Sequence, residues 1–112
     1  MATLTVQDIT ISGTAVTTAA VSSGGDEFLN TNNNVFTEVW NDHATDPRTL
    51  TIETTKTVGG LAVADRDITI PALSRIMIRP LDGSIYNDGD NKAQLTYSDS
   101  GADMRIAVFK MA

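Results

Sequence analysis

The 112-residue chain contains no cysteine, only three prolines, a single histidine and six aromatic residues. Without cysteine it cannot form a disulfide framework, a zinc ribbon or a thiol nucleophile. No apolar run approaches the roughly 20 residues that a membrane-spanning helix needs. Residues 1–10 have neither a basic start nor an apolar centre. We therefore expect a soluble chain with no transmembrane helix, no membrane partner and no secretory signal.

Positive charge is also scarce, because eight Lys and Arg stand against fourteen Asp and Glu, for a formal net charge of −6. The eight cations are scattered between Arg48 and Lys110. Binding to a polyanion requires clustered Lys and Arg that neutralise phosphates, so we expect no nucleic-acid partner. Most of the acidic residues are Asp, which favours turns over helix interiors. The acidic charge is therefore expected in loops.

Threonine is abundant, with sixteen copies, and many of them stand in alternating runs. β-branched residues suit a pleated, half-exposed surface better than a helix. After residue 25, alternation predicts seven or eight short strands separated by polar turns, at intervals of roughly 8 to 12 residues. We therefore predict an all-β domain at 26–112, an antiparallel β-sandwich or jelly roll. The last two strands, 93–97 and 104–110, are expected to form a hairpin through a short polar link that contains Gly101.

Residues 1–25 differ from the rest, since they are mostly Thr, Ala, Ser, Val and Gly with one charge, Asp8. One interpretation is a first strand followed by a surface loop. The other is an extended arm that packs on a neighbouring subunit and adds a strand to it. The candidate contact residues of such an arm are Leu4, Val6, Ile9 and Ile11.

Candidate catalytic and metal-binding residues are few. His43 has no further His or Cys at ligand spacing and no nucleophile that it would serve, so a solvated turn explains it better. Segment 82–91 is rich in Asp, Asn and Gly, but Ser84 and Tyr86 stand where an EF-hand loop needs ligands, and no Glu follows. We expect no enzymatic activity, metal, cofactor or small-molecule substrate, with an irregular calcium site at 82–91 as the open alternative.

Large apolar residues on strands suggest a binding surface. If Val35 and Val39 face the interior, then Phe36 and Trp40 need a second place of burial, and aromatics on an outer sheet face indicate an interface. The alternative is that the strand has the opposite orientation, with Phe36 and Trp40 pointing into the core. Met77, which is expected to point outward, is a further candidate interface residue.

Seven short phrases follow one another along most of the chain: Leu4–Ile9, Gly24–Phe28, Val35–Asn41, Ile68–Ala72, Arg79–Leu81, Tyr86–Asp88 and Gln94–Tyr97. In order and spacing they resemble a family of small proteins encoded in the head-gene clusters of tailed bacteriophages. The resemblance implies a capsid decoration (cement) protein, made in the host cytoplasm, that binds the major capsid protein on the outer surface of the icosahedral head. A symmetric oligomer is expected, with a homotrimer favoured by the threefold sites of such a shell.

A different function class stays open. The chain could be a carbohydrate- or receptor-binding β module of a phage fibre, or another minor head protein. In the carbohydrate-binding case, the residues that would stack on sugar rings are Trp40, Tyr86 and Tyr97.

Overall fold

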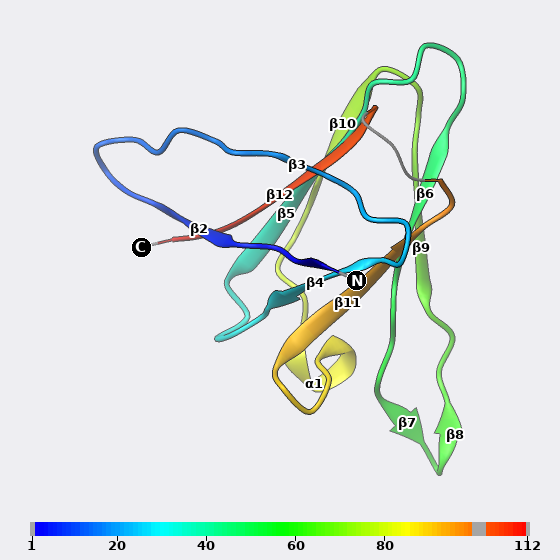
Figure 1. Cartoon of the computed structure of the whole chain (residues 1–112). Helices are drawn as coiled ribbons and strands as arrows, with labels where there is room; N and C mark the ends of the chain where they lie inside the picture. The colour runs from blue at the N-terminus through cyan, green and yellow to red at the C-terminus, as the bar shows by residue number, and fades with distance from the viewer. Residues whose placement is uncertain (1, 100–102, 112) are drawn as a thin grey trace.

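The structure is a computed structural model, and it describes residues 2–99 and 103–111. Within these residues the chain forms twelve strands and one four-residue helix, so the prediction of an all-β fold is confirmed (Figure 1). The elements are β1 (Ala2–Thr3), β2 (Val6–Ile9), β3 (Ala19–Ala20), β4 (Asp26–Leu29), β5 (Val35–Asn41), β6 (Arg48–Ile52), β7 (Thr57–Val58), β8 (Leu61–Ala62), β9 (Arg66–Ile70), β10 (Ser74–Ile78), α1 (Gly83–Tyr86), β11 (Lys92–Tyr97) and β12 (Met104–Met111). Nine of the described strands follow residue 25, and two of these, β7 and β8, are only two residues long.

The strands form two five-stranded sheets and one small hairpin. The first sheet has the order β1-β4-β11-β6-β9. The second has the order β10-β5-β12-β2, and β3 also pairs with β12. β7 and β8 form the hairpin. In this arrangement β9 and β10 are edge strands, one from each sheet.

Both sheets contribute side chains to one main core. On β5 the alternating residues Val35, Thr37 and Val39 are buried, as a strand with one face on a core requires. β12 alternates in the same way and adds Met104 and Ile106. The main core consists of Leu4, Val21, Phe28, Val35, Val39, Leu50, Ile52, Ile70, Leu81, Ala93, Leu95, Met104, Ile106 and Val108.

The three strands within residues 2–25 pair with later strands of the same chain. β1 runs parallel to β4, β2 runs parallel to β12, and β3 runs antiparallel to β12. Leu4 and Val21 are buried in the main core. Most of the stretch 10–18 between β2 and β3 is exposed. The segment therefore combines strands that extend both sheets with a largely exposed loop.

The predicted hairpin of the last two strands is wrong. β11 pairs with β4 and β6 in the first sheet, whereas β12 pairs with β5, β2 and β3 in the second. Polar residues at 98–103 suit a link between two sheets as well as a hairpin turn, so turn composition could not separate the two topologies. Beside this link, the buried Arg48 forms ion pairs with Asp99 and Asp103. Gly101, on which the hairpin prediction relied, lies outside the described residues.

Candidate functional site

The second sheet has an apolar outer face, on the side opposite the main core. On β5, Val35 and Val39 belong to the main core, whereas Phe36 and Trp40 belong to a separate cluster. The sequence left open which of these two pairs faces the interior. In the structure, Val35 and Val39 face the main core, and Phe36 and Trp40 lie on the opposite face of the sheet. This outer cluster consists of Trp40, Ala107 and Phe109, with Ile9 and Phe36 packed against them.

An aromatic pair forms the centre of the outer cluster. Phe36 on β5 and Phe109 on β12 are register partners. Their ring centroids lie 5.5 Å apart with an interplanar angle of 32°. Aromatic pairs at this separation add favourable packing beyond the area that they bury. Because both rings belong to central strands of the sheet, their positions are fixed by the backbone ladder.

Trp40 is only 7% exposed, although it lies on the outer face. Its register partners are Arg75 on β10 and Arg105 on β12. The Arg75 guanidinium lies 5.1 Å from the centre of the indole ring, in a cation–π contact. Arg105 donates from Nε to Thr18 Oγ1 at 2.7 Å and from Nη2 to the Thr18 carbonyl at 3.0 Å. The burial of Trp40 leaves little of its ring for a sugar or a protein partner.

A groove of about 290 Å³ lies beside the outer cluster, and we call it the outer groove. It is lined by Ile9, Thr14, Val16, Phe36, Glu38, Met77 and Phe109. Val16 and Met77 are 55% and 53% exposed. An exposed groove with apolar walls on a rigid sheet is suited to bind apolar side chains of another protein.

The structure brings three of the seven predicted interface residues together, because Ile9, Phe36 and Met77 all line the outer groove. The other four lie elsewhere. Leu4 is buried in the main core of its own chain and Val6 packs against that core, Trp40 is buried in the outer cluster, and Ile11 is fully exposed in the turn after β2.

Val16 was missed by sequence reasoning. It reaches the outer groove because the stretch after residue 13 runs back beside β2. There the Gln7 side chain donates to the Thr17 carbonyl at 2.7 Å and accepts from the Thr17 N–H at 2.9 Å, as a neighbouring backbone would. No alternation of large residues marks this stretch in the sequence. Its position follows from a side-chain contact that periodicity cannot show.

The candidate catalytic and metal-binding residues take part in turns. Nδ1 of His43 accepts the backbone N–H groups of Thr45 and Asp46, at 3.2 and 2.9 Å. Asp82 accepts the hydroxyl and the N–H of Ser84, and these two hydrogen bonds hold the pKa of its carboxyl below the ordinary value. The described residues include no group of three or more His, Cys, Asp or Glu side chains that could hold a metal ion.

Asp88 is the second carboxylate of segment 82–91 that binds its own loop. Its side chain accepts the N–H groups of Lys92 at 3.1 Å and Asp90 at 2.8 Å, and also the Gln94 amide at 2.7 Å. These contacts lower the pKa of Asp88, with the backbone N–H of Lys92 as the largest cause. The carboxylate therefore closes a turn between α1 and β11.

Comparison of the chain with protein-family models, with curated proteins and with solved structures gives no match. In the part of the chain that the structure describes, no helix has the length and hydrophobicity to cross a lipid bilayer.

Proposed function

We propose that the chain is a structural binding protein, a capsid decoration protein that attaches to the outer surface of a tailed-phage head and stabilises it. The observation that carries the proposal is the outer groove, an exposed apolar surface on a sheet whose other face is already buried. The resemblance of the seven sequence phrases to phage head proteins supports the same function. The partner is then the major capsid protein, and the location is the virion surface.

The shape of the fold supports a role that depends on binding alone. We propose that the two five-stranded sheets pack face to face as a β-sandwich, because their buried residues belong to one main core. A sandwich of this kind holds the outer face of β5, β10 and β12 rigid. A rigid surface loses little conformational entropy when it binds, so more of the contact energy remains as affinity.

Repetition of a modest contact supplies the strength that decoration needs. The outer groove is small, and a single copy would bind a shell weakly. In a symmetric oligomer, here proposed as a homotrimer, each further contact becomes effectively intramolecular after the first. Avidity of this kind requires no catalytic group, cofactor or nucleic acid, and we propose none for this chain.

The proposal is tested by binding to heads of the phage whose genome encodes the chain. Wild-type protein should sediment with heads that lack it, and mass spectrometry of intact virions should find the polypeptide. Val16→Glu places a charge in the outer groove at a side chain that is 55% exposed, so it should fold normally and lose binding. The matched control is Val58→Glu on β7, where the side chain is 62% exposed and lies outside the groove.

Two results would overturn the proposal. One is undiminished sedimentation of Val16→Glu with the heads. The other is a set of virions in which the polypeptide is missing.

A further inference from the structure

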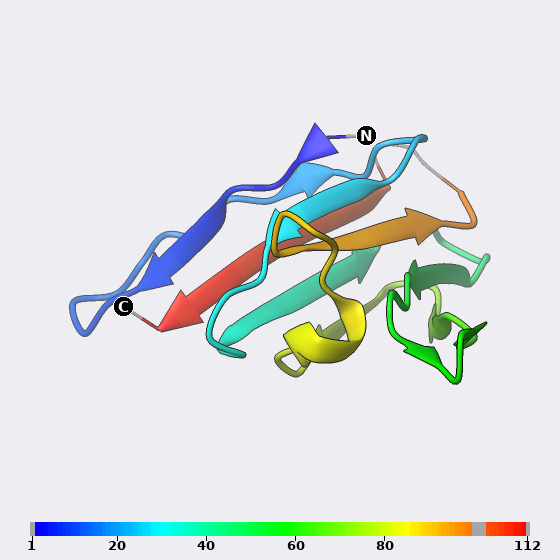
Figure 2. The ribbon, with the colours of Figure 1, turned by 90° about the horizontal axis from the view of Figure 1, so that it is seen from below.

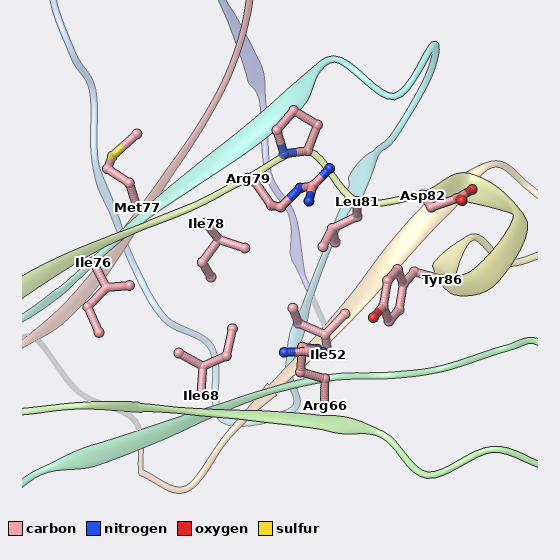
Figure 3. A pocket seen from close by; sticks show the side chains of 11 residues that line it. Ile52, Arg66, Ile68, Ile76, Met77, Ile78, Arg79, Leu81, Asp82 and Tyr86 are labelled. Atoms are coloured by element: carbon pink, nitrogen blue, oxygen red, sulfur yellow. The ribbon is translucent and has the colours of Figure 1, made fainter.

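A second cavity, with a volume of about 610 Å³, lies between the edge strands β9 and β10 and shares Met77 with the outer groove. We call it the edge cleft. Figure 3 shows Ile76 and Ile78 of β10 facing Ile68 of β9 across this space, with Tyr86 of α1 at one end. All three isoleucines pack against the main core but stay partly exposed. A cleft of this volume accepts several apolar side chains.

Two arginines line the edge cleft beside these isoleucines, Arg66 on β9 and Arg79 just after β10. Both are exposed, and neither has an ion-pair partner in the described part of the chain. Asp82 also lines the cleft, but its carboxylate accepts hydrogen bonds from Ser84. Unpaired cations around an apolar space favour a partner that is both apolar and acidic.

The chain itself offers an apolar side chain at Ile11, three residues after the acidic Asp8. This side chain is 105% exposed, the highest value among the large apolar residues of the described chain. The turn that holds it is ordered by hydrogen bonds: Gly13 N–H to the Thr10 carbonyl at 3.1 Å, and Thr14 Oγ1 to the Asp8 carbonyl at 2.7 Å. Ile11 is therefore held out in water by a defined backbone.

One acidic side chain, Asp8, lies just before this turn, and the turn 10–13 itself carries no charge. The Asp8 side chain, on β2, is 56% exposed, and its Oδ1 lies 3.7 Å from Lys110 Nζ. An exposed pair at this distance contributes little, so the Asp8 carboxylate can exchange Lys110 for an arginine.

The two surfaces cannot meet within one molecule. Figures 1 and 2 both show the turn after β2 on one side of the folded molecule and β9 on the opposite side. We infer that the turn 10–13 of one copy, with Ile11 at its tip, docks in the edge cleft of a second copy. Turn and cleft are different surfaces, so the contact is head-to-tail and closes into a ring when the rotation allows it. The inference rests on the proposed function for its purpose, because it supplies the contact that builds the symmetric oligomer.

The experiment uses the purified full chain without heads. Sedimentation velocity should give a wild-type oligomer larger than the 11.9 kDa chain. Ile11→Asp and the double variant Arg66→Glu, Arg79→Glu change exposed side chains on opposite sides of the contact. Each should weaken self-association by about tenfold to a hundredfold, because one loses apolar burial and the other loses charge complementarity. Leu61→Asp, at a side chain that is 74% exposed on β8, is the matched control and should assemble like the wild type.

Mixing the two variants gives the decisive measurement. The Ile11→Asp copy keeps an intact cleft and the arginine variant keeps an intact turn, so an equimolar mixture should form a 1:1 heterodimer and no larger ring. A monomeric wild type, an Ile11→Asp variant that still assembles fully, or a mixture that stays monomeric would overturn the inference. Binding of monomers to heads would leave the proposed function standing, since it is measured separately through Val16.

Discussion

Tyr97 on β11 donates its hydroxyl to Asp26 Oδ2 on β4 at 2.7 Å. Asp26 is fully buried, and its other carboxylate oxygen has no partner in the described structure. Burial of the phenol, together with this bond to Asp26, raises the pKa of Tyr97 far above its ordinary value of 10.0. Within the first sheet, the Tyr97 hydroxyl is therefore the main hydrogen-bond donor to the buried Asp26 carboxylate.

Replacement of Tyr97 by Phe should lower the free energy of unfolding by about 1–3 kcal/mol, because it leaves the Asp26 carboxylate without its strongest donor. Urea unfolding followed by circular dichroism measures the loss. Tyr86→Phe is the control, since the Tyr86 hydroxyl makes no hydrogen bond to another described residue. An equal loss of unfolding free energy in both variants would show that the hydrogen bond to Asp26 does not stabilise the fold.

Two glycines with the same backbone angle give a second test. Gly25 and Gly13 both have φ of +92°, which L residues rarely adopt. A Cβ on Gly25 would lie 2.5 Å from the Leu95 carbonyl oxygen, whereas a Cβ on Gly13 would meet nothing within 4 Å. Gly25→Ala should therefore cost about 2–4 kcal/mol, and Gly13→Ala only about 1–2 kcal/mol, from backbone strain alone. Thermal melting of both variants measures the difference, and equal costs would contradict the contact with Leu95.

The fold class and part of the site could be predicted from sequence because they depend on local alternation. Val35 and Val39 alternate with Phe36 and Trp40, and that pattern alone places the two pairs on opposite faces. It cannot say which pair faces the main core, since both are apolar. The choice depends on the other sheet, whose Leu50 and Ile52 belong to the same main core as Val39.

Long-range pairing is the part that the sequence could not supply. The strand pattern at 93–97 and 104–110 is correct, yet the two strands belong to different sheets. β11 pairs with β4 and β6, β12 pairs with β5, β2 and β3, and Arg48, far away in the sequence, forms an ion pair with Asp103 beside the link. Likewise, Gln7 positions the loop that carries Val16 through a side-chain contact. Contacts between distant residues leave no period in a single sequence.

Stability should fall in acid through the pair Glu27 and Lys92. Lys92 Nζ lies 2.9 Å from Glu27 Oε2, and this bond is the largest cause that holds the pKa of Glu27 below its ordinary 4.5. The same contact raises the pKa of Lys92 above 10.5. Because the folded-state pKa of Glu27 is the lower one, its contribution is present above pH 4.5 and is lost as the pH falls through the folded value.

The measurement is the urea midpoint of unfolding at about pH 7 and about pH 3. The difference between the two midpoints should shrink in Glu27→Gln, because the titrating carboxyl is gone. It should not vanish, since Asp88 also has a lowered pKa and remains. Glu53→Gln, at an exposed position, is the control and should keep the full dependence. A Glu27→Gln variant with the wild-type dependence would show that the pair does not contribute.

Arg48 should stabilise the link between β11 and β12, which joins the two sheets. Its side chain is 8% exposed, and Nη2 lies 3.0 Å from Asp103 Oδ2 while Nη1 pairs with Asp99. Arg48→Met should cost about 1–3 kcal/mol, since the two carboxylates lose their shared cation but remain near water. Arg48→Lys should recover only part of the loss, because an ammonium lacks the planar fork that reaches two carboxylates at once. Chemical denaturation at low and at high salt measures both variants. Full recovery of stability by lysine would show that the positive charge alone, without the geometry of the guanidinium, stabilises the link between β11 and β12.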